Sequence, residues 1–193
     1  MTVRSAYPNE VRTVAELHAS RITEGFLTSL GPPFLRRLYR RVSRDQHAFL
    51  LVDSREGVVT GFVAGVTDLG GLYRRFLLRD GIIAGIQAAR HVIPAVPRLI
   101  ETLKYPSATE ALPDAEILAV AVHARSGGRG VGTSLVRAAT QEFERRAVVS
   151  AKVVTTADNV AALAMYRSCG FVSTARIEVH AGRGSEVLVW TAS

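Results

Sequence analysis

The sequence contains a single cysteine, Cys169, among 193 residues. One cysteine excludes an intramolecular disulfide and a zinc site built from several cysteines, and it is typical of a protein in a reducing cytosol. Long hydrophobic runs are missing as well, because the longest apolar stretches, 81–89 and 117–122, fall far short of the roughly 20 residues of a membrane-spanning helix. The first residues carry charges and a proline where a secretory signal needs an apolar stretch. We therefore expect a cytoplasmic protein with no membrane span and no metal.

Lysine is scarce too, since Lys104 and Lys152 are the only two and all other basic residues are arginines. The 24 basic and 17 acidic residues give a formal net charge of +7, a balance found in proteins that bind nucleic acids, anionic membranes or phosphorylated ligands. The arginines are scattered, and no recognition motif or aromatic stacking array accompanies them, so we expect no nucleic-acid partner. The densest group recurs at helical spacing opposite apolar residues, which predicts the solvated face of an amphipathic helix: Arg36, Arg37, Arg40, Arg41 and Arg44.

The chain is long enough, and at 48% hydrophobic apolar enough, to bury the core of one domain over residues 1–193. Helical and β-rich patterns alternate along it in an order that predicts a mixed α/β (α+β) fold around one sheet. The predicted elements are a helix from residue 11 to 22 capped by Asn9, a helix over 34–42, a hairpin of strands 47–52 and 58–66 around the turn 53–57, a helical insert over 70–105, a central strand over 117–122, a helix beginning near Thr133, a strand over 153–156, a helix over 161–168, and a last hairpin of strands 176–180 and 187–190.

A glycine-rich loop, Gly127-Gly-Arg-Gly-Val-Gly132, directly follows the predicted central strand and opens the next helix. Successive backbone N–H groups in such a turn, added to the positive end of a helix, form an anion site. The loop therefore predicts phosphate binding, with a flexible turn as the alternative. Neither the Rossmann nor the Walker pattern fits, because the third glycine comes one residue early for the first and the lysine of the second is missing.

A second pattern lies further along, at Asn159-Val-Ala-Ala-Leu-Ala-Met-Tyr-Arg-Ser-Cys-Gly-Phe171. Asn159 is placed to cap a helix, Ala162 and Tyr166 share one helical face, and Gly170 is a left-handed stop. By itself this pattern predicts only a well-terminated helix.

Together the two segments resemble the GNAT superfamily of acyl-CoA-dependent N-acyltransferases. The family signature V-x-P-x-x-R-G-x-G-[IV]-G corresponds to Val122-His-Ala-Arg-Ser-Gly-Gly-Arg-Gly-Val-Gly132, and N-x-x-A-x-x-x-Y-x-x-x-G-F is matched at Asn159, Ala162, Tyr166, Gly170 and Phe171. One departure from the first signature matters, because Gly127 stands where an Arg or Gln is usual. A side-chain contact to pyrophosphate is then either missing or supplied by Arg125 or Arg129.

The resemblance implies a GNAT fold, with a mostly antiparallel mixed sheet splayed between its fourth and fifth strands and a helical insert between strands three and four. It implies acetyl-CoA as cosubstrate, held in that gap, with no metal. The residues implied to bind the cosubstrate are Val120, Ala121 and Val122 beside the pantetheine, Gly127, Gly128, Arg129, Gly130, Val131, Gly132 and Thr133 around the pyrophosphate, and Asn159, Ala162 and Tyr166 on the following helix.

For catalysis, the resemblance places the Tyr166 phenol at the thioester sulfur, where it can protonate the departing thiolate; the alternative is a core aromatic. Glu116 stands where some members keep a general base, although an acidic residue at a strand entrance is often only solvated. His123 is an alternative base. Cys169 has no motif histidine beside it and is expected to be a small buried residue.

The amine acceptor is expected to contact the segment between the first two helices, where Phe26, Thr28 and Ser29 line its pocket or simply pack the loop. The insert 70–105 is compatible with a lid, a homodimer surface or a patch on anionic lipid. The leading hypothesis is acetyl transfer from acetyl-CoA to a primary amine of a small molecule, an amino sugar being one candidate. Acetylation of a protein amine and a non-catalytic acyl-CoA-binding module remain as alternatives.

Overall fold

The fold is that of a computed structural model, which describes residues 2–23, 28, 31–72, 112–180 and 183–192. Nearly all of the predicted insert 70–105 lies outside the described residues, as do Phe26 and Ser29. The elements are β1 (Thr2–Ser5), the 3₁₀ turn η1 (Pro8–Glu10), α1 (Val11–Arg21), α3 (Gly31–Val42), β2 (Ala48–Arg55), β3 (Val58–Val66), β4 (Glu116–Val122), the 3₁₀ turn η2 (Ala124–Ser126), α6 (Val131–Arg145), β5 (Ser150–Thr156), α7 (Val160–Ser168), β6 (Val172–His180) and β7 (Arg183–Thr191).

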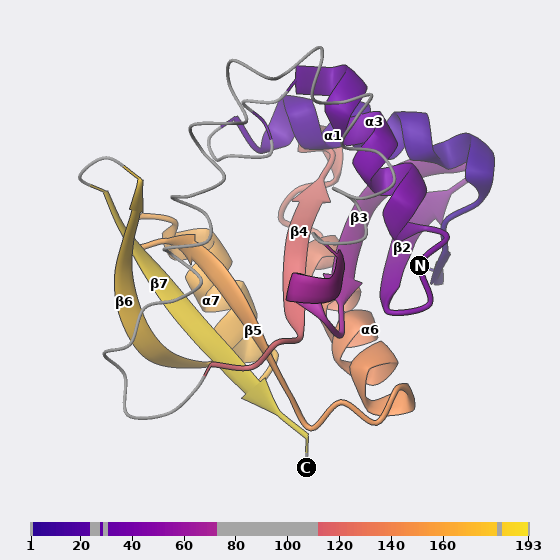
Figure 1. Ribbon diagram of the computed structural model, residues 1–193. Helices are drawn as coiled ribbons and strands as arrows, with labels where there is room; N and C mark the ends of the chain where they lie inside the picture. The colour runs from indigo at the N-terminus through magenta and orange to yellow at the C-terminus, as the bar shows by residue number, and fades with distance from the viewer. Residues whose placement is uncertain (1, 24–27, 29–30, 73–111, 181–182, 193) are drawn as a thin grey trace.

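Seven strands form one mixed sheet in the order β1-β2-β3-β4-β5-β7-β6. All neighbouring pairs are antiparallel except β4 and β5, which run parallel. These two are joined only by the pairs Glu116–Lys152 and Ile117–Val153, after which they diverge (Figure 1). The fold class, the central position of β4 and the splay beside it are as the sequence predicts.

The two faces of the sheet carry separate hydrophobic cores (Figure 1). On β2, Leu50 and Val52 join the core under α1 and α3, whereas Phe49 and Leu51 join the core under α6 and α7. This alternation follows from the two-residue period of a strand and shows that β2 is covered on both sides. Strand β4 itself is covered by α1 on one face and by α6 on the other.

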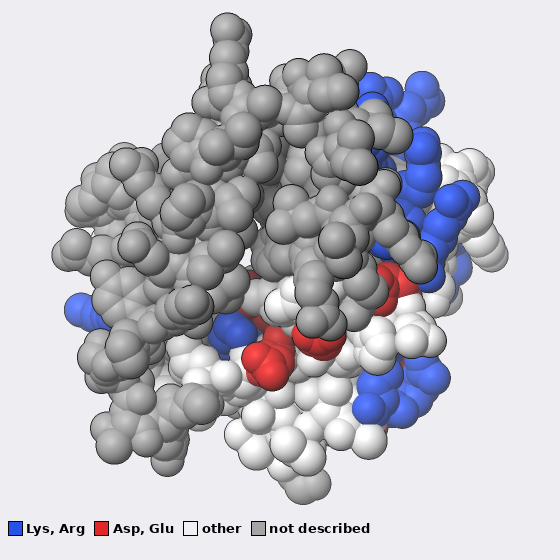
Figure 2. Space-filling view, viewed as in Figure 1, with Lys and Arg blue, Asp and Glu red and all other residues white. Residues whose placement is uncertain are grey.

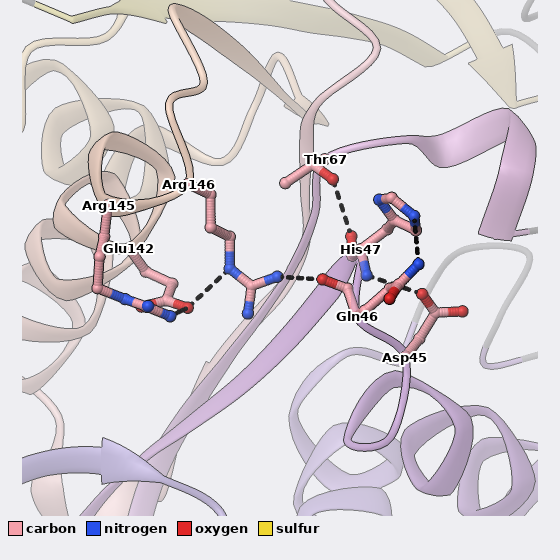
Figure 3. Close-up of polar contacts among 7 residues, drawn as sticks. All are labelled: Asp45, Gln46, His47, Thr67, Glu142, Arg145 and Arg146. Carbon is pink, nitrogen blue, oxygen red and sulfur yellow. Dashed lines mark hydrogen bonds and ion pairs between the residues drawn. The ribbon is translucent and has the colours of Figure 1, made fainter.

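The C-terminal end of α6 is tied to the segment before β2 (Figure 3). The Arg146 guanidinium donates to the Gln46 carbonyl at 2.7 Å and forms an ion pair with Glu142 at 2.7 Å. The neighbouring His47 carbonyl accepts from the Thr67 backbone N–H at 2.8 Å, at the end of β3. These contacts hold the far end of α6 against the β2–β3 hairpin, while its N-terminal end follows β4.

Basic side chains gather over α1 and α3 in the space-filling view (Figure 2). On α3 the apolar side chains Leu35, Leu38, Tyr39 and Val42 are buried, so the amphipathic helix predicted from its arginine pattern is confirmed. Within the described part of the chain, no helix is long and apolar enough to cross a membrane.

The N-terminal segment differs from the sequence prediction in two ways. β1 was not expected, because four residues are too few for an alternating pattern to show. Asn9 does not cap the first helix, since it lies inside η1. Glu10 stands at the N-cap of α1 without a side-chain cap bond, and its carboxylate instead accepts from the Tyr7 N–H of η1 at 2.8 Å and pairs with Arg4 at 2.7 Å.

Several element boundaries also differ from the prediction, since α3, β5, β6 and β7 all begin earlier than expected. The turn of the first hairpin is shorter than 53–57, because β2 continues to Arg55 and only Glu56 and Gly57 connect the strands. Both have positive φ, 50° and 78°, as the tight turns that suit the twist of a hairpin require. The helix expected to begin near Thr133 begins at Val131, directly after the left-handed Gly130.

Candidate active site

The edge of β4 that faces the gap offers free backbone groups. The His123 N–H donates to the Thr60 carbonyl of β3 at 2.8 Å, and peptide groups two residues apart on a strand point the same way. The N–H and C=O of Ala121 therefore point to β3, and those of Val120 and Val122 point into the gap. Of the three residues predicted to pair with pantetheine, Val120 and Val122 have their backbone groups on that side.

A β-bulge bends β4 where the gap opens. Ala64 of β3 pairs with Ala119, but the next residue, Gly65, pairs with Ile117, so Leu118 is left over. An extra residue increases the local twist and bend of its strand. The bulge follows directly after the last residue of β4 that pairs with β5, and so it contributes to their divergence.

The glycine loop, residues 127–133, adopts the conformation expected of an anion site. Gly128 and Gly130 have φ of 71° and 76°, and a Cβ on either would meet nothing within 4 Å. Glycine is thus needed there for the backbone conformation and not for space. The first turn of α6 leaves its leading N–H groups without helical partners, and no side chain caps them. Gly127 to Gly130 are exposed, and the loop follows the end of β4 that lies away from its pairs with β5, so the positive helix end is accessible there.

Gly132 is present for a different reason. A Cβ at this position would lie 2.7 Å from the Met165 sulfur of α7 and 3.7 Å from the Val122 side chain. The missing side chain lets α6 and α7 approach each other closely. The last glycine of the loop is therefore a packing residue.

Arg125 precedes the loop and Arg129 lies within it, and the first residue of the loop, Gly127, is extended. Arg125 and Arg129 are both exposed, and neither forms an ion pair with any described residue. Both side chains are thus free to contact an anion bound to the loop, in place of the Arg or Gln missing at Gly127.

Helix α7 is terminated as its sequence predicts. Asn159 Oδ1 accepts from the Ala162 N–H at 3.1 Å, and Gly170 ends the helix with a φ of 88°. The cap uses only the amide oxygen, so the exposed Asn159 NH₂ group remains available as a donor. Whether it contacts pantetheine stays a prediction.

Tyr166 is 5% exposed, and its ring lies 5.7 Å from that of Phe171. Burial raises the pKa of the phenol above its ordinary value, with a smaller contribution from Cys169. The hydroxyl therefore keeps its proton at neutral pH, as a general acid must. Cys169 is partly buried and its thiol donates to the Thr133 carbonyl at 3.7 Å, which fits a packing residue between α6 and α7.

Glu116 lies at the closed end of the gap. Burial raises the pKa of its carboxyl, and the nearby Lys152 ammonium partly offsets this shift. The Lys152 Nζ is 3.5 Å from the Glu116 Oε2. Sequence reasoning gave Lys152 no role, because only the parallel register of β4 and β5 brings it to Glu116. His123, the alternative base, is exposed, and its Nδ1 accepts from the Arg125 N–H at 3.3 Å.

Thr28, predicted to line the acceptor pocket, is bonded toward the core. Its hydroxyl donates to the Ile22 carbonyl at 2.6 Å, so it accepts from His18 Nε2 at 3.1 Å. His18 Nδ1 then accepts from the Tyr39 hydroxyl at 2.5 Å. Every donor in this chain of bonds is used once. Thr28 could therefore contact an amine substrate only through its methyl group or through the remaining lone pair of its hydroxyl oxygen.

The family assignment follows from the sequence as a whole. The family model described as the acetyltransferase (GNAT) family matches residues 14–171. The chain belongs to the GNAT acetyltransferase family. No curated protein matches it in sequence.

Solved structures share the GNAT fold at low identity. The ribosomal-protein-alanine N-acetyltransferase of Brucella melitensis is 15% identical, with a TM-score of 0.66 and full coverage of both chains. A mutant of the spermidine N-acetyltransferase SpeG of Vibrio cholerae is 13% identical, with a TM-score of 0.62 over 99% of this chain and 95% of that chain. The yncA protein of Salmonella typhimurium, solved with its cofactor acetyl-CoA, is 15% identical, with a TM-score of 0.65 over 98% of this chain and 92% of that chain.

GNAT enzymes use acetyl-CoA as acetyl donor, and the described residues fit it. The loop offers outward N–H donors to a pyrophosphate, and the free edge of β4 offers peptide groups to the amides of a pantetheine arm. The chain is thus an acetyltransferase of the GNAT family.

Proposed function

We propose that this GNAT enzyme transfers the acetyl group of acetyl-CoA to a primary amine of a small molecule, by direct attack of the amine on the thioester. The observation that carries the proposal is the order of groups along the gap. The anion loop lies at the open end, the free peptide groups of Val120 and Val122 come next, and Glu116 lies at the closed end.

The chemistry assigns one proton transfer to each ionisable side chain. The amine nitrogen forms a bond to the carbonyl carbon, the C–S bond breaks, and its electron pair leaves with the sulfur. Glu116 accepts the proton that nitrogen loses, directly or through a water, and the Tyr166 hydroxyl protonates the thiolate. Burial raises both pKa values, which strengthens the carboxylate as a base and keeps the phenol protonated.

The charge of the protein bears on the acceptor. A net charge of +7, with basic side chains over α1 and α3 (Figure 2), repels polycations, attracts anionic molecules and leaves neutral ones unhindered. An amino sugar presents one amine on a neutral or acidic framework, whereas a polyamine brings several positive charges. We therefore propose an amino sugar before a polyamine.

The test is a panel of amines assayed for CoA release from acetyl-CoA, with amino sugars, polyamines and peptides carrying a free N-terminus in separate arms. Turnover of an amino sugar is the expected result. Turnover confined to peptides would replace the small molecule with a protein amine. Binding of acetyl-CoA without turnover in any arm would contradict the proposal and favour a non-catalytic module.

A further inference from the structure

Lys152 is a buried lysine at the point where the β4–β5 gap closes. Its side chain is 10% exposed, although an ammonium is costly to bury unless it is paired and hydrogen-bonded. Both requirements are met, because Nζ donates to the Pro113 carbonyl and lies 3.5 Å from the Glu116 carboxylate. None of these three residues lies in either of the two GNAT motifs, which cover Val122–Gly132 and Asn159–Phe171.

Backbone pairing also brings Glu116 and Lys152 together, in addition to their side-chain contact. Glu116 and Lys152 are direct partners in the parallel ladder, one of the two pairs that join β4 to β5. The Lys152 N–H also donates to the Ala115 carbonyl at 2.9 Å. Val66, which pairs with Glu116 on β3, belongs to the core under α1 and α3. Glu116 and Lys152 therefore lie on that face of the sheet.

The pair lies at the end of the gap opposite the anion loop. Val122 comes six positions after Glu116 on β4, a separation of about 20 Å at the rise of a strand. A cosubstrate whose pyrophosphate binds the loop, and whose arm follows the free edge of β4, brings its thioester toward Glu116. The base of the proposed reaction is thus adjacent to the lysine.

We infer that Lys152 is a positioning residue for the reaction: its ammonium, anchored by the Pro113 carbonyl, keeps the Glu116 carboxylate ionised and fixed at the closed end of the gap. The inference rests on the proposed role of Glu116 as base. A buried carboxyl without a cation retains its proton and cannot accept one from the amine. The attraction of the lysine opposes this effect, since Lys152 lowers the pKa of Glu116 that burial raises.

No other described cation acts on Glu116. β3 contributes the apolar Val66, and beyond it the Asp68 carboxylate accepts from the Gly71 N–H at 2.7 Å. Asp114, in the segment before β4, is exposed. On α1, His18 stacks on the Phe62 ring, whose strand partner is Ala121 at the other end of β4.

The first test compares Lys152→Met, which keeps the length of the side chain without its charge, with Lys152→Arg, which keeps a cation. We expect the acid limb of the kcat/KM profile to move up by about one pH unit in Lys152→Met. Activity at a pH below the limb then falls about tenfold and recovers at higher pH. Lys152→Arg should stay near the wild-type limb. A Lys152→Met limb that does not move, in an enzyme that binds acetyl-CoA and turns over, would overturn the inference.

A second test needs no turnover. The chain has two lysines, so ¹⁵N-lysine labelling of the unmodified protein gives two Nζ signals to follow against pH. We expect one of them to shift with the same midpoint as a glutamate side-chain carbon, and Glu116→Gln to remove both changes. Two lysine signals that show no such midpoint would contradict the inference, whereas failure of the amine panel alone would contradict only the proposed reaction.

Discussion

Burial raises the pKa of Tyr166 and of Glu116 alike, with opposite consequences for the two side chains. A phenol with a raised pKa is protonated at neutral pH but is a weaker acid, so its donation of a proton to the thiolate is a proposal that needs a direct test. A carboxyl with a raised pKa is a stronger base once ionised, but it ionises less readily. The Lys152 ammonium lies beside the glutamate, which is the arrangement that a buried carboxyl acting as a base would need.

Replacement of Tyr166 by phenylalanine tests its proton. The ring and its packing on Phe171 are kept, so acetyl-CoA affinity should change little, while single-turnover acetyl transfer should fall by roughly 10²- to 10⁴-fold. The exposed Tyr7 gives a matched control, because Tyr7→Phe removes the same atom far from the gap. Unchanged single-turnover rates, under conditions where chemistry limits the reaction, would leave Tyr166 as a core aromatic.

The sequence predicts the arrangement of residues that are held together by local spacing. It does not predict contacts that depend on the register between two strands. Asn159, Tyr166 and Gly170 lie within one helix and its stop, so their arrangement was predictable from a periodicity of 3.6. Lys152 is 36 positions away from Glu116. Their contact requires the parallel pairing of β4 with β5, and no pattern in a single sequence specifies that pairing.

At the level of elements, the anion loop combines one glycine needed for its backbone and one needed for packing. Gly130 has a left-handed φ and open space around a Cβ, whereas Gly132 has a helical conformation and the Met165 sulfur in the way. Sequence analysis treats both simply as members of a glycine-rich run. Only the structure separates their roles, because they depend on dihedral angles and on a neighbouring helix.

Substitution of Gly130 by alanine should weaken cosubstrate binding. An L-residue at a φ of 76° costs about 1–2 kcal/mol and favours a shift of the loop away from its anion-binding conformation. Gly57 is the matched control, with a φ of 78° and equally open space in the first hairpin turn.

Both variants should lose similar stability, but only Gly130→Ala should reduce the rise in melting temperature caused by acetyl-CoA. Equal ligand-induced shifts in the two variants would show that the loop conformation does not matter for binding. A wild-type protein that shows no shift at millimolar acetyl-CoA would remove the cosubstrate site itself.

The shortest elements were the least predictable, for a physical reason. β1 has four residues and η1 three, so neither spans enough turns or alternations to produce a period. Their conformation is fixed by partners elsewhere, namely the register of β1 with β2 and the ion pair of Glu10 with Arg4. The long amphipathic helices α3 and α6 bury one face each, so the helical spacing of their apolar residues can be recognised in the sequence.

Across the whole molecule, one buried histidine should make the free energy of unfolding depend on pH. His18 is 2% exposed, and burial lowers its pKa from 6.5 to about 4. Above pH 6.5 the imidazole is neutral in both the folded and the unfolded state, and its full contribution to the free energy of unfolding is present. As the pH falls below 6.5, His18 binds a proton in the unfolded chain but not in the folded one, so stability is lost down to about pH 4.

The expected loss over that window is about 3 kcal/mol, measured by urea unfolding at a series of pH values. Glu10, Glu142 and Glu186 have pKa values lowered from 4.5 by their hydrogen bonds, and their effects begin at lower pH. His18→Gln, which stays neutral throughout, should flatten the slope between pH 6.5 and 4.5 even if its stability is lower. An equal slope in the two proteins would assign the pH dependence to other groups.

The divergence of β4 and β5 has a mechanical consequence. Two residue pairs cannot fix the angle between strands β1–β4 and strands β5–β7, so that angle must be set by whatever bridges the two halves. On one face the bridge is the contact of α6 with α7, where Gly132 meets Met165. The side chains between these helices then act as a spacer. Gly132, the one residue of α6 without a side chain, therefore helps to set the width of the gap proposed to hold the cosubstrate.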